Sequence, residues 1–344
     1  MSDAVLPKND TTPPTIGVLL IDDFSLMSYA AAVEPLRAAN LLSGRELYRW
    51  RHVAVRGDVA EASNGGRVVA DLRVGDTERL DTLLVCAGGN PALFDDAATF
   101  GWLRALARKG VRLGGISGGP YLLAKAGLLN GYRCTVHWEH LPALAEAYPD
   151  LQLQRTLYEL DRDRLTCAGG VAAMDMMVEL IARDHGRALA AVVADWYLRS
   201  EIRAGGAAQR MPLRERTGVS DTRLLRALAY MEAHVEEPAS LSTLAAIAGV
   251  SPRQLERLFR RLLGEAPAAR YLQIRLDRAH VLLRQTTMTT IEAAVACGFV
   301  NGSHFSRTYK ARFGAPPSRD RDPTVGYLGP IIADGRRATC AERR

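Results

Sequence analysis

One short run in the first half of the chain carries the residue types of a hydrolytic site. Residues 115–119 read Gly-Ile-Ser-Gly-Gly and match the GxSxG pattern of a nucleophile elbow. In such an elbow a sharp turn between a strand and a helix presents one side chain, here Ser117, above the sheet. The N–H groups that open the following helix, from Gly118 and Gly119, then form a corner that binds an anion. The pattern therefore predicts a special turn at Ser117 that serves either a nucleophile or an anion.

Hydrolysis by Ser117 would need a histidine base and a carboxylate that orients it. A serine hydrolase of the α/β type places its acidic residue and then its histidine well downstream of the serine, whereas His137 follows after only twenty residues. His140 and His185 have no convincing carboxylate in the required order either. The sequence therefore favours a non-catalytic Ser117, with a hydrolase as the alternative.

A second group of candidate residues lies in a segment that is repeated near the C-terminal end. Shifted by fifty residues, Arg257 falls on Arg307. Upstream, Gly249 matches Gly298 at a shift of forty-nine, so one residue has been added before Phe305 in the second copy. Two copies predict one duplicated motif rather than a solenoid, which needs about three units.

Each copy is expected to form a short helix, a tight turn and a longer helix, with Gly249 ending the first short helix in the left-handed conformation. The expected helix caps are Ser242 and Ser251 in the first copy, and Thr289 or Thr290 and then Ser303 in the second. The expected inward-facing residues of the longer helices are Leu255, Leu258, Phe259 and Leu262, and Phe305, Tyr309 and Phe313.

The outward faces of the two longer helices carry Arg, Gln, His and Ser, as reading of the DNA major groove requires. The residues predicted to contact DNA are Arg253, Gln254, Glu256, Arg257, Arg260, Asn301, Ser303, His304, Arg307 and Lys310. Arg260 and Lys310 lie further along their helices and are expected to contact phosphate, whereas residues nearer the turns are expected to read bases. A helical bundle with basic, solvated faces is the alternative.

The run 296–317, ACGFVNGSHFSRTYKARFGAPP, closely resembles the signature of the DNA-binding domain of the AraC/XylS family of bacterial transcription regulators. The resemblance implies two helix-turn-helix units whose reading helices enter adjacent major grooves about 34 Å apart. It also implies a promoter or operator in double-stranded DNA as a partner, RNA polymerase as a second partner, a homodimer, and activation as the commoner mode of regulation.

Charge is distributed unevenly along the 344 residues, which are enough for two domains. Residues 201–344 hold 23 basic and 14 acidic side chains, whereas residues 1–200 hold 21 and 24, so only the second half is expected to bind a polyanion. The five cysteines are odd in number and include no CxxC, which disfavours a disulfide framework or a metal site. With no signal peptide and no run of membrane length, we expect a cytoplasmic protein without a cofactor.

Strand-length apolar runs alternate with helical segments through residues 15–202. This order predicts an α/β domain with flavodoxin-like layers and a mainly parallel sheet. The expected strands are 15–21, 48–55, 68–70, 82–85, 111–116, 133–136 and a hairpin of 156–160 with 164–167. The expected helices are 25–40, 99–109, 121–126, 138–148, 172–185 and 190–202. A disordered lead-in at 1–14, a linker at 203–221, an all-α domain with two helix-turn-helix motifs at 222–321 and a tail at 322–344 complete the prediction.

The first half also resembles the glutamine-amidotransferase-like superfamily that includes the intracellular proteases, and more narrowly the sensor half of GlxA-type AraC regulators. The matching stretches are 32–40, 117–124, 126–131, 134–139, 167–170 and 174–177. In catalytic relatives the elbow residue is a cysteine, supported by a glutamate from the first helix and often by a histidine. The resemblance puts Glu34 and His137 at those supports, but Ser117 replaces the cysteine. A serine has no thiolate form, so the departure disfavours catalysis and leaves a pocket.

On this resemblance the old active site is expected to bind an effector. The predicted ligand-binding residues are Glu34, Ser117, Gly118, Gly119, Tyr121, His137 and Trp138. The elbow and His137 would hold a carboxylate, and Glu34 would face a cation or form a hydrogen bond with Ser117. The alternatives are that Glu34 caps or pairs locally and that His137 is structural. Tyr121 and Trp138 would offer aromatic faces to an ammonium group, or else are core aromatics. Because such regulators often sense amino-acid-like or betaine-like nutrients, the predicted effector is a small zwitterion. An amidase-like or hydratase-like enzyme with an appended DNA-binding domain is the alternative.

Overall fold

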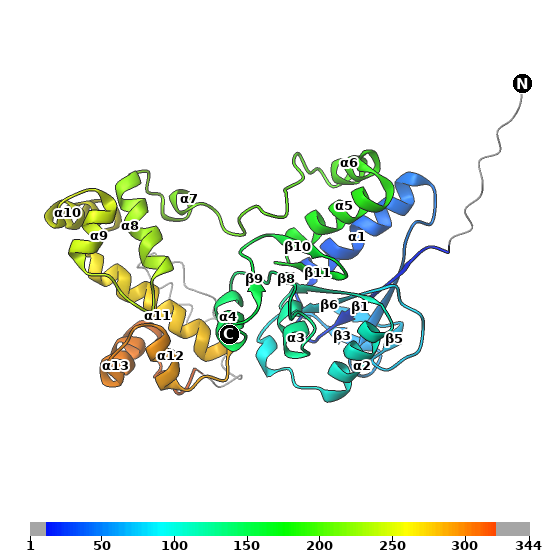
Figure 1. The fold of residues 1–344 in the computed structure, drawn as a ribbon, viewed down its shortest axis with the longest axis horizontal. Coiled ribbons are helices and arrows are strands. Elements are labelled where there is room, and N and C mark those ends of the chain that lie inside the picture. The colour runs from blue at the N-terminus through cyan, green and yellow to red at the C-terminus, as the bar shows by residue number, and fades with distance from the viewer. Residues whose placement is uncertain (1–11, 321–344) are drawn as a thin grey trace, which may run out of the picture. The chain divides into compact units, whose positions relative to one another are not determined.

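The computed structural model describes residues 12–320, which form two compact units (Figure 1). The first unit comprises the described residues up to Asp221 together with Arg284–Thr287, and the second comprises Thr222–Leu283 and the described residues from Met288 on. Most of the predicted lead-in and all of the predicted tail lie outside the described residues. Across residues 12–320, none of the helices is both long and apolar enough to span a membrane.

The first unit is built on a seven-stranded sheet in which only the edge strand β10 is antiparallel to its neighbour. In order across the sheet the strands are β10 (Tyr158–Asp161), β11 (Arg164–Cys167), β7 (Arg112–Ser117), β6 (Thr82–Ala87), β1 (Thr15–Leu20), β2 (Arg49–Ala54) and β5 (Leu72–Arg73). The predicted mainly parallel α/β sheet is therefore confirmed, and β10 and β11 form the predicted hairpin.

Two short strand pairs lie outside this sheet. They are β3 (Val59–Glu61) with β4 (Arg67–Val69), which is antiparallel, and β8 (Arg133–Cys134) with β9 (Gln152–Leu153), which is parallel. The strand predicted at 68–70 thus belongs to a separate hairpin, and the one predicted at 133–136 keeps only two residues. Strands of two or three residues show too few side chains for an alternating pattern, so β3, β5 and β9 were not predicted.

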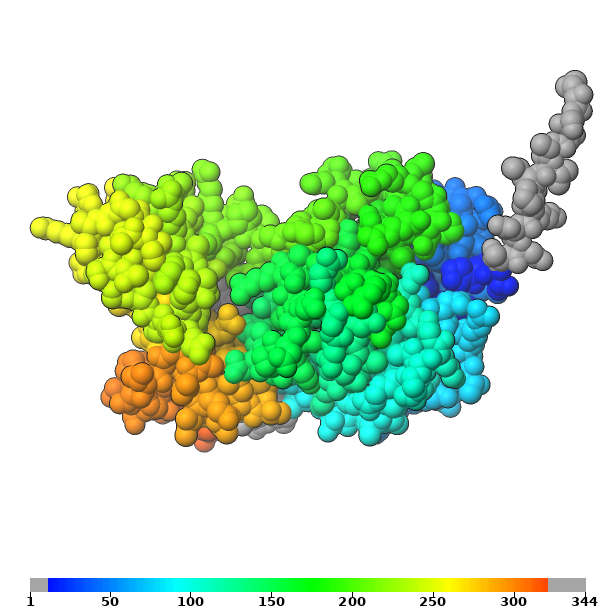
Figure 2. Space-filling model, in the orientation of Figure 1, coloured from blue at the N-terminus to red at the C-terminus, as the bar shows by residue number. Residues whose placement is uncertain are grey.

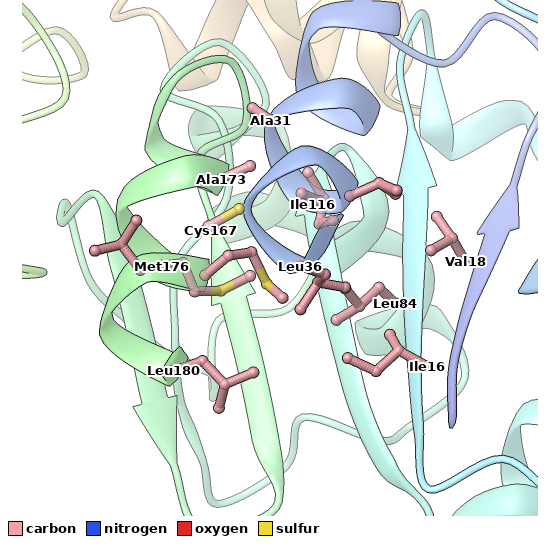
Figure 3. Packing of buried hydrophobic residues seen from close by; sticks show 14 of the residues in the cluster. Ile16, Val18, Ala31, Leu36, Leu84, Ile116, Cys167, Ala173, Met176 and Leu180 are labelled. Carbon is pink, nitrogen blue, oxygen red and sulfur yellow. The ribbon is translucent and has the colours of Figure 1, made fainter. Parts of the chain in front are cut away.

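Helices cover both faces of the sheet. On one side lie α1 (Leu26–Ser43), α5 (Ala172–His185) and α6 (Arg187–Trp196), and on the other α2 (Ala97–Arg108), α3 (Gly119–Lys125) and α4 (Leu141–Ala147). Because side chains alternate along a strand, Val18 of β1 contacts the first layer and Leu19 the second. Figure 3 shows Ile116 of β7, Leu36 of α1 and Met176 of α5 among the buried side chains of the first layer.

Two predicted helices of this unit have different bounds. The helix predicted at 190–202 is α6, which ends at Trp196, and Leu198 then takes a left-handed φ of +55° that breaks the helix. The chain continues to the short helix α7 (Leu213–Thr217), and a single 3-10 turn, η1 (Pro91–Leu93), follows β6. The helix predicted at 138–148 is α4, which starts only at Leu141 because the preceding residues form a turn on His137.

The second unit is all helical. Its helices are α8 (Thr222–Ala233), α9 (Leu241–Ala248), α10 (Pro252–Leu263), α11 (Pro267–Gln285), α12 (Thr290–Ala296) and α13 (Gly302–Phe313). The pairs α9–α10 and α12–α13 are the two predicted helix-turn-helix units. The 19-residue helix α11 between them was not predicted, although Pro267 at its first position is a known start signal. Leu276 and Leu283 of α11 belong to the same buried core as Phe305 of α13.

Candidate functional site

Ser117 ends β7 in the sharp turn that the GxSxG pattern predicts. Its φ is +60°, a left-handed conformation that residues with a side chain rarely adopt. α3 begins two residues later at Gly119. A Cβ added at Gly119 would lie 1.9 Å from the Val85 carbonyl oxygen, and one at Gly115 would lie 2.5 Å from the Pro120 nitrogen. The turn therefore depends on glycine at both positions.

Only part of the predicted anion-binding corner is open to a ligand. The Gly118 N–H donates to the Ala87 carbonyl oxygen at 2.9 Å and so ties the turn to the end of β6. Gly118 thus serves the turn, and its expected role as an anion donor is not supported. The N–H of Gly119 has no hydrogen-bond acceptor among residues 12–320, as is usual for the first N–H groups of a helix, so it can donate to a ligand.

Glu34, the carboxylate expected near Ser117, has other partners. It accepts hydrogen bonds from the Tyr197 hydroxyl at 2.8 Å and from Arg37 at 2.7 Å, and its side chain is 41% exposed. The expected hydrogen bond between Glu34 and Ser117 is therefore wrong, and the cation that Glu34 faces belongs to the protein. Residues six apart on a helix differ by about 240° around the axis, so Glu34 and Ser28 point to different sides of α1.

Ser28 occupies the side of α1 that faces the elbow. It is 1% exposed, and its Oγ accepts the Gly170 N–H at 2.7 Å. A Cβ added at Gly169 would lie 2.5 Å from Ser117 Cβ and 2.9 Å from Ser28 Oγ, so the two serines meet across this glycine. The polar neighbour of Ser117 from α1 is therefore a hydroxyl and not a carboxylate. Sequence reasoning missed it because a lone serine in an apolar helix carries no signal of its own.

His137 lies beside the elbow, where its backbone N–H faces the Ser117 carbonyl oxygen at 3.3 Å. Its ring Nδ1 accepts the Glu139 N–H at 3.4 Å, a contact that favours the tautomer with the proton on Nε2. In this tautomer Nε2 donates a hydrogen bond and cannot take a proton from a serine. Burial, and then the neighbouring His140, lowers the pKa of His137 to about 4. The ring is therefore a neutral donor at pH 7, which suits a ligand carboxylate better than general-base catalysis.

Glu139 is an acidic residue of this corner that sequence reasoning did not include. Its Oε2 lies 3.8 Å from His137 Nδ1, and burial raises the pKa of Glu139 to about 7. Its proximity in sequence to His137 was the available signal. Among residues 12–320, no group of three or more His, Cys, Asp or Glu side chains could hold a metal ion.

The two predicted aromatic residues have different surroundings. Tyr121 is 4% exposed and packs edge to face on Tyr148, with ring centroids 5.9 Å apart, in the core on the α2–α4 side of the sheet. Burial raises the pKa of Tyr121 to about 12. Tyr121 is thus a core aromatic, the alternative interpretation. Trp138 is half-buried, and the Arg210 guanidinium lies 4.5 Å from its ring centre. Trp138 therefore already binds a cation, one from the chain itself.

The helix α10 presents basic side chains outward from a well-capped start. Ser251 accepts the Gln254 N–H at 3.3 Å, and Gln254 Oε1 accepts the Ser251 N–H at 2.9 Å, which completes a capping box. The oxygen of Gln254 is thus engaged by the helix and is less free to read a base. Arg253, Arg257 and Arg260 are exposed, and within residues 12–320 none of them forms an ion pair with the protein.

The first helix-turn-helix motif, α9–α10, differs from the prediction in its cap and in the exposure of two side chains. Ser240, and not Ser242, caps α9, because its Oγ accepts the Thr243 N–H at 3.2 Å. Leu262 is 40% exposed and lies outside the buried stripe of Leu255, Leu258 and Phe259. Glu256 is only half-exposed, so it is a weaker candidate for a base contact than its arginine neighbours.

The helix α13 begins two residues earlier than predicted. Asn301 is its cap, with Oδ1 accepting the N–H groups of Ser303 at 2.9 Å and His304 at 3.0 Å. Ser303 as the cap was therefore wrong, and its hydroxyl is left exposed at the helix start. His304, Arg307 and Lys310 are exposed along the outer face, as the pattern predicts. In Figure 2 the yellow and orange segments that contain α10 and α13 form part of the surface of the second unit.

The added residue of the second copy lies in its turn. One residue, Val250, lies between Gly249 and the cap Ser251, whereas two residues lie between Gly298 and the cap Asn301. Both glycines are left-handed, with φ of +70° and +72°. The short helix α12 before the turn is capped by Thr289 through a capping box with Glu292. The helix α13 therefore starts one residue later after its turn glycine than α10 does.

A polar cluster fixes α13 onto α11. His280 Nδ1 lies 2.7 Å from the Tyr309 hydroxyl and 3.0 Å from Asp320 Oδ2, and Tyr309 also donates to Asp320. Arg312 makes two hydrogen bonds of 2.8 Å to Asp277. These contacts set the position of α13, and they could not be anticipated without α11.

Comparison with known proteins gives a consistent result for both units. Residues 15–183 match the DJ-1/PfpI family model and residues 244–322 match a helix-turn-helix domain model. The chain is 45% identical over 318 residues to the HTH-type transcriptional regulator GbdR of Pseudomonas aeruginosa, covering 92% of this chain and 86% of that protein. It is 44% identical to CdhR of the same organism, covering 88% and 90%, and 45% identical to GlxA of Rhizobium meliloti, covering 88% and 94%.

Proposed function

The chain belongs to the AraC-type helix-turn-helix transcription regulators that carry an N-terminal DJ-1/PfpI domain, and we propose that a small effector bound at the Ser117 elbow controls its action on promoters. The regulator acts in the cytoplasm as a homodimer and activates transcription together with RNA polymerase. The basic excess of residues 201–344 supports the second unit as the part that binds DNA.

The observation that carries the effector proposal is a strained elbow without a catalytic base. Ser117 keeps its φ of +60°, held by close-packed glycines, although such a conformation costs about 1–3 kcal/mol. Two features disfavour catalysis. The α1 side chain that meets Ser117 across Gly169 is Ser28 and not a carboxylate, and His137 presents a hydrogen-bond donor instead of a base. A site that keeps its backbone but has no base is better suited to binding than to hydrolysis, so the protein is proposed not to be an enzyme.

The groups around the elbow indicate the chemistry of the effector. Ser117, the N–H of Gly119 and Nε2 of His137 are neutral donors that suit a carboxylate. Trp138 offers an aromatic face that already accepts a guanidinium, and an ammonium group of a ligand would be held in the same way. A small zwitterion, amino-acid-like or betaine-like, combines both groups.

The roles on DNA follow from the exposed faces of α10 and α13. Arg253 and Arg257, near the start of α10, and His304 and Arg307, near the start of α13, are proposed to read bases. Arg260 and Lys310 lie one turn further and are proposed to contact phosphate. The side-chain oxygens of Gln254 and Asn301 accept hydrogen bonds at the starts of their helices. We therefore propose that these two residues support DNA binding by fixing the helices and not by reading bases.

Thermal unfolding of the full chain with a panel of small amino acids and quaternary amines tests the effector site. An effector raises the unfolding midpoint by mass action, because it binds only the folded state. Trp138→Ala is expected to abolish that rise for quaternary amines, whereas Trp196→Ala, at an exposed tryptophan of α6, is expected to keep it. An equal rise in both variants would remove Trp138 from the site.

A further inference from the structure

The stretch between α6 and α7 is bound to the first unit at one end by a buried carboxylate. Arg199 donates to Asp175 Oδ1 at 2.7 Å and Arg203 to Asp175 Oδ2 at 2.9 Å. Asp175, on α5, is 2% exposed. A buried carboxylate that loses its cationic partners is strongly destabilising, so this end of the stretch is firmly anchored. The sequence had predicted a linker from residue 203.

The middle of the same stretch runs beside β10. The Leu157 N–H donates to the Gly205 carbonyl oxygen at 2.8 Å, and Ala208 forms an antiparallel bridge with Thr156. A Cβ added at Gly205 would lie 2.8 Å from the Tyr158 carbonyl oxygen, so glycine permits the close approach. Residues 199–210, which we call the latch, therefore cover part of the sheet edge.

The far end of the latch reaches the wall of the proposed effector site. The two N–H donors of Gln209 Nε2 are shared among three acceptors, Thr135 Oγ1 at 3.0 Å, the Val136 carbonyl oxygen at 2.9 Å and the Thr156 carbonyl oxygen at 2.7 Å. The next residue, Arg210, stacks on Trp138. Val136 and Trp138 flank His137, whose N–H faces Ser117. One short segment thus contacts the elbow on one side and the latch on the other.

We propose that effector binding at the elbow releases the Gln209–Arg210 end of the latch and thereby lengthens the tether to the DNA-binding unit. The proposal rests on the effector site proposed above. A ligand ammonium group that stacks on the same face of Trp138 displaces the Arg210 guanidinium. A shift of His137 toward the ligand carboxylate also moves Val136 away from Gln209. The anchor at Asp175 is unaffected, so only the chain beyond it becomes free.

Amide hydrogen exchange of the full chain tests the latch without any ligand. Residues 204–210 and Leu157 are expected to be protected in the wild type. Gln209→Ala and Arg210→Ala should each raise their exchange about tenfold, because removal of these contacts costs roughly 1–2 kcal/mol. Arg214→Ala, an exposed arginine four residues beyond the latch, is the matched control and should leave exchange unchanged. The latch would be contradicted if residues 204–210 exchange rapidly in the wild type, or if neither Gln209→Ala nor Arg210→Ala changes their exchange.

The same measurement with glycine betaine as the probe tests the coupling. Glycine betaine should raise exchange at residues 204–210 in the wild type and leave Arg210→Ala, which is already released, unchanged. A rise in the unfolding midpoint without any change in exchange would leave the effector site standing and overturn the coupling. If neither glycine betaine nor any zwitterion of the panel shifts the midpoint, the proposed effector class is wrong and the coupling falls with it, while ligand-free exchange still decides the latch.

Discussion

At the Ser117 elbow the backbone is buried and held tightly by the fold, whereas on α10 and α13 most of the candidate side chains are exposed and basic. The elbow takes its shape from backbone contacts at Gly115, Gly119 and Gly169, where one extra carbon has no room. The reading helices take theirs from caps and an apolar stripe, and their arginines project freely. The two regions should therefore respond differently to substitution. Added volume should damage the elbow, and lost charge should damage DNA binding while stability stays nearly constant.

The largest effect is expected from Gly119→Ala in the elbow. Its new Cβ would overlap the Val85 carbonyl oxygen at 1.9 Å, and this should lower the free energy of unfolding of the first unit by about 3 kcal/mol or more. Gly101→Ala in α2 is the control, since its Cβ would meet nothing within 4 Å and should stabilise the helix by up to about 1 kcal/mol. Similar denaturation midpoints for the two variants would contradict the tight turn described here.

On the DNA-reading side, Arg257→Ala should cost about 1–3 kcal/mol of binding to the target sequence and relax specificity at one base position. Arg260→Ala should weaken binding to target and random duplexes alike, because a phosphate contact carries no sequence information. Titrations at one fixed salt concentration compare the two variants. An equal loss on both duplexes for Arg257→Ala would refute its role in base reading.

The corner beside the elbow should also give the first unit a pH dependence near neutrality. Burial raises the pKa of Glu139 to about 7, so folding favours its protonated form, and the resulting stability is lost as pH rises from about 4.5 through 7. Glu139→Gln should remove this loss and gain about 1–2 kcal/mol over the wild type at pH 8, after allowance for partial exposure. Denaturation at pH 5 and pH 8 measures it, and parallel pH profiles of the two proteins would contradict the shift.

The smallest effect is expected from loss of the helix cap of α13. Asn301→Ala should cost the second unit about 1 kcal/mol, because two N–H groups at the start of α13 lose their acceptor. Ser303→Ala should change its stability very little, since this hydroxyl does not cap the helix. Chemical denaturation of both variants decides the matter, and the opposite order would restore Ser303 as the cap.

Local patterns predicted what depends on neighbours in sequence. The apolar runs predicted most strands of the main sheet, and the glycines around Ser117 predicted the turn, because both follow from a few consecutive residues. The shift of fifty residues also places Asn301, the cap of α13, opposite Ser251, the cap of α10. Here the repeat was a stronger guide than the preference of single residues for helix ends.

Other features depend on packing that no local pattern carries. Whether Glu34 or Ser28 faces the elbow is decided by the rotation of α1 on the sheet, because both lie in the same mixed apolar run. The bond from Gly118 to Ala87 requires two strands to end side by side. The latch at residues 199–210 has the glycines and arginines of an ordinary linker. Its sequence alone does not show that it is bound to Asp175 and to the segment around His137.

Ser117→Gly tests most directly the proposal that the elbow binds an effector and does not catalyse. Glycine adopts a φ of +60° freely, so the variant should fold with no loss of stability while it lacks the hydroxyl. The measurement is the unfolding midpoint of wild type and variant with the zwitterion panel, beginning with glycine betaine. We predict that the wild-type midpoint rises and that the Ser117→Gly midpoint does not. An equal rise in the variant, or consumption of the ligand by the wild type, would contradict the account.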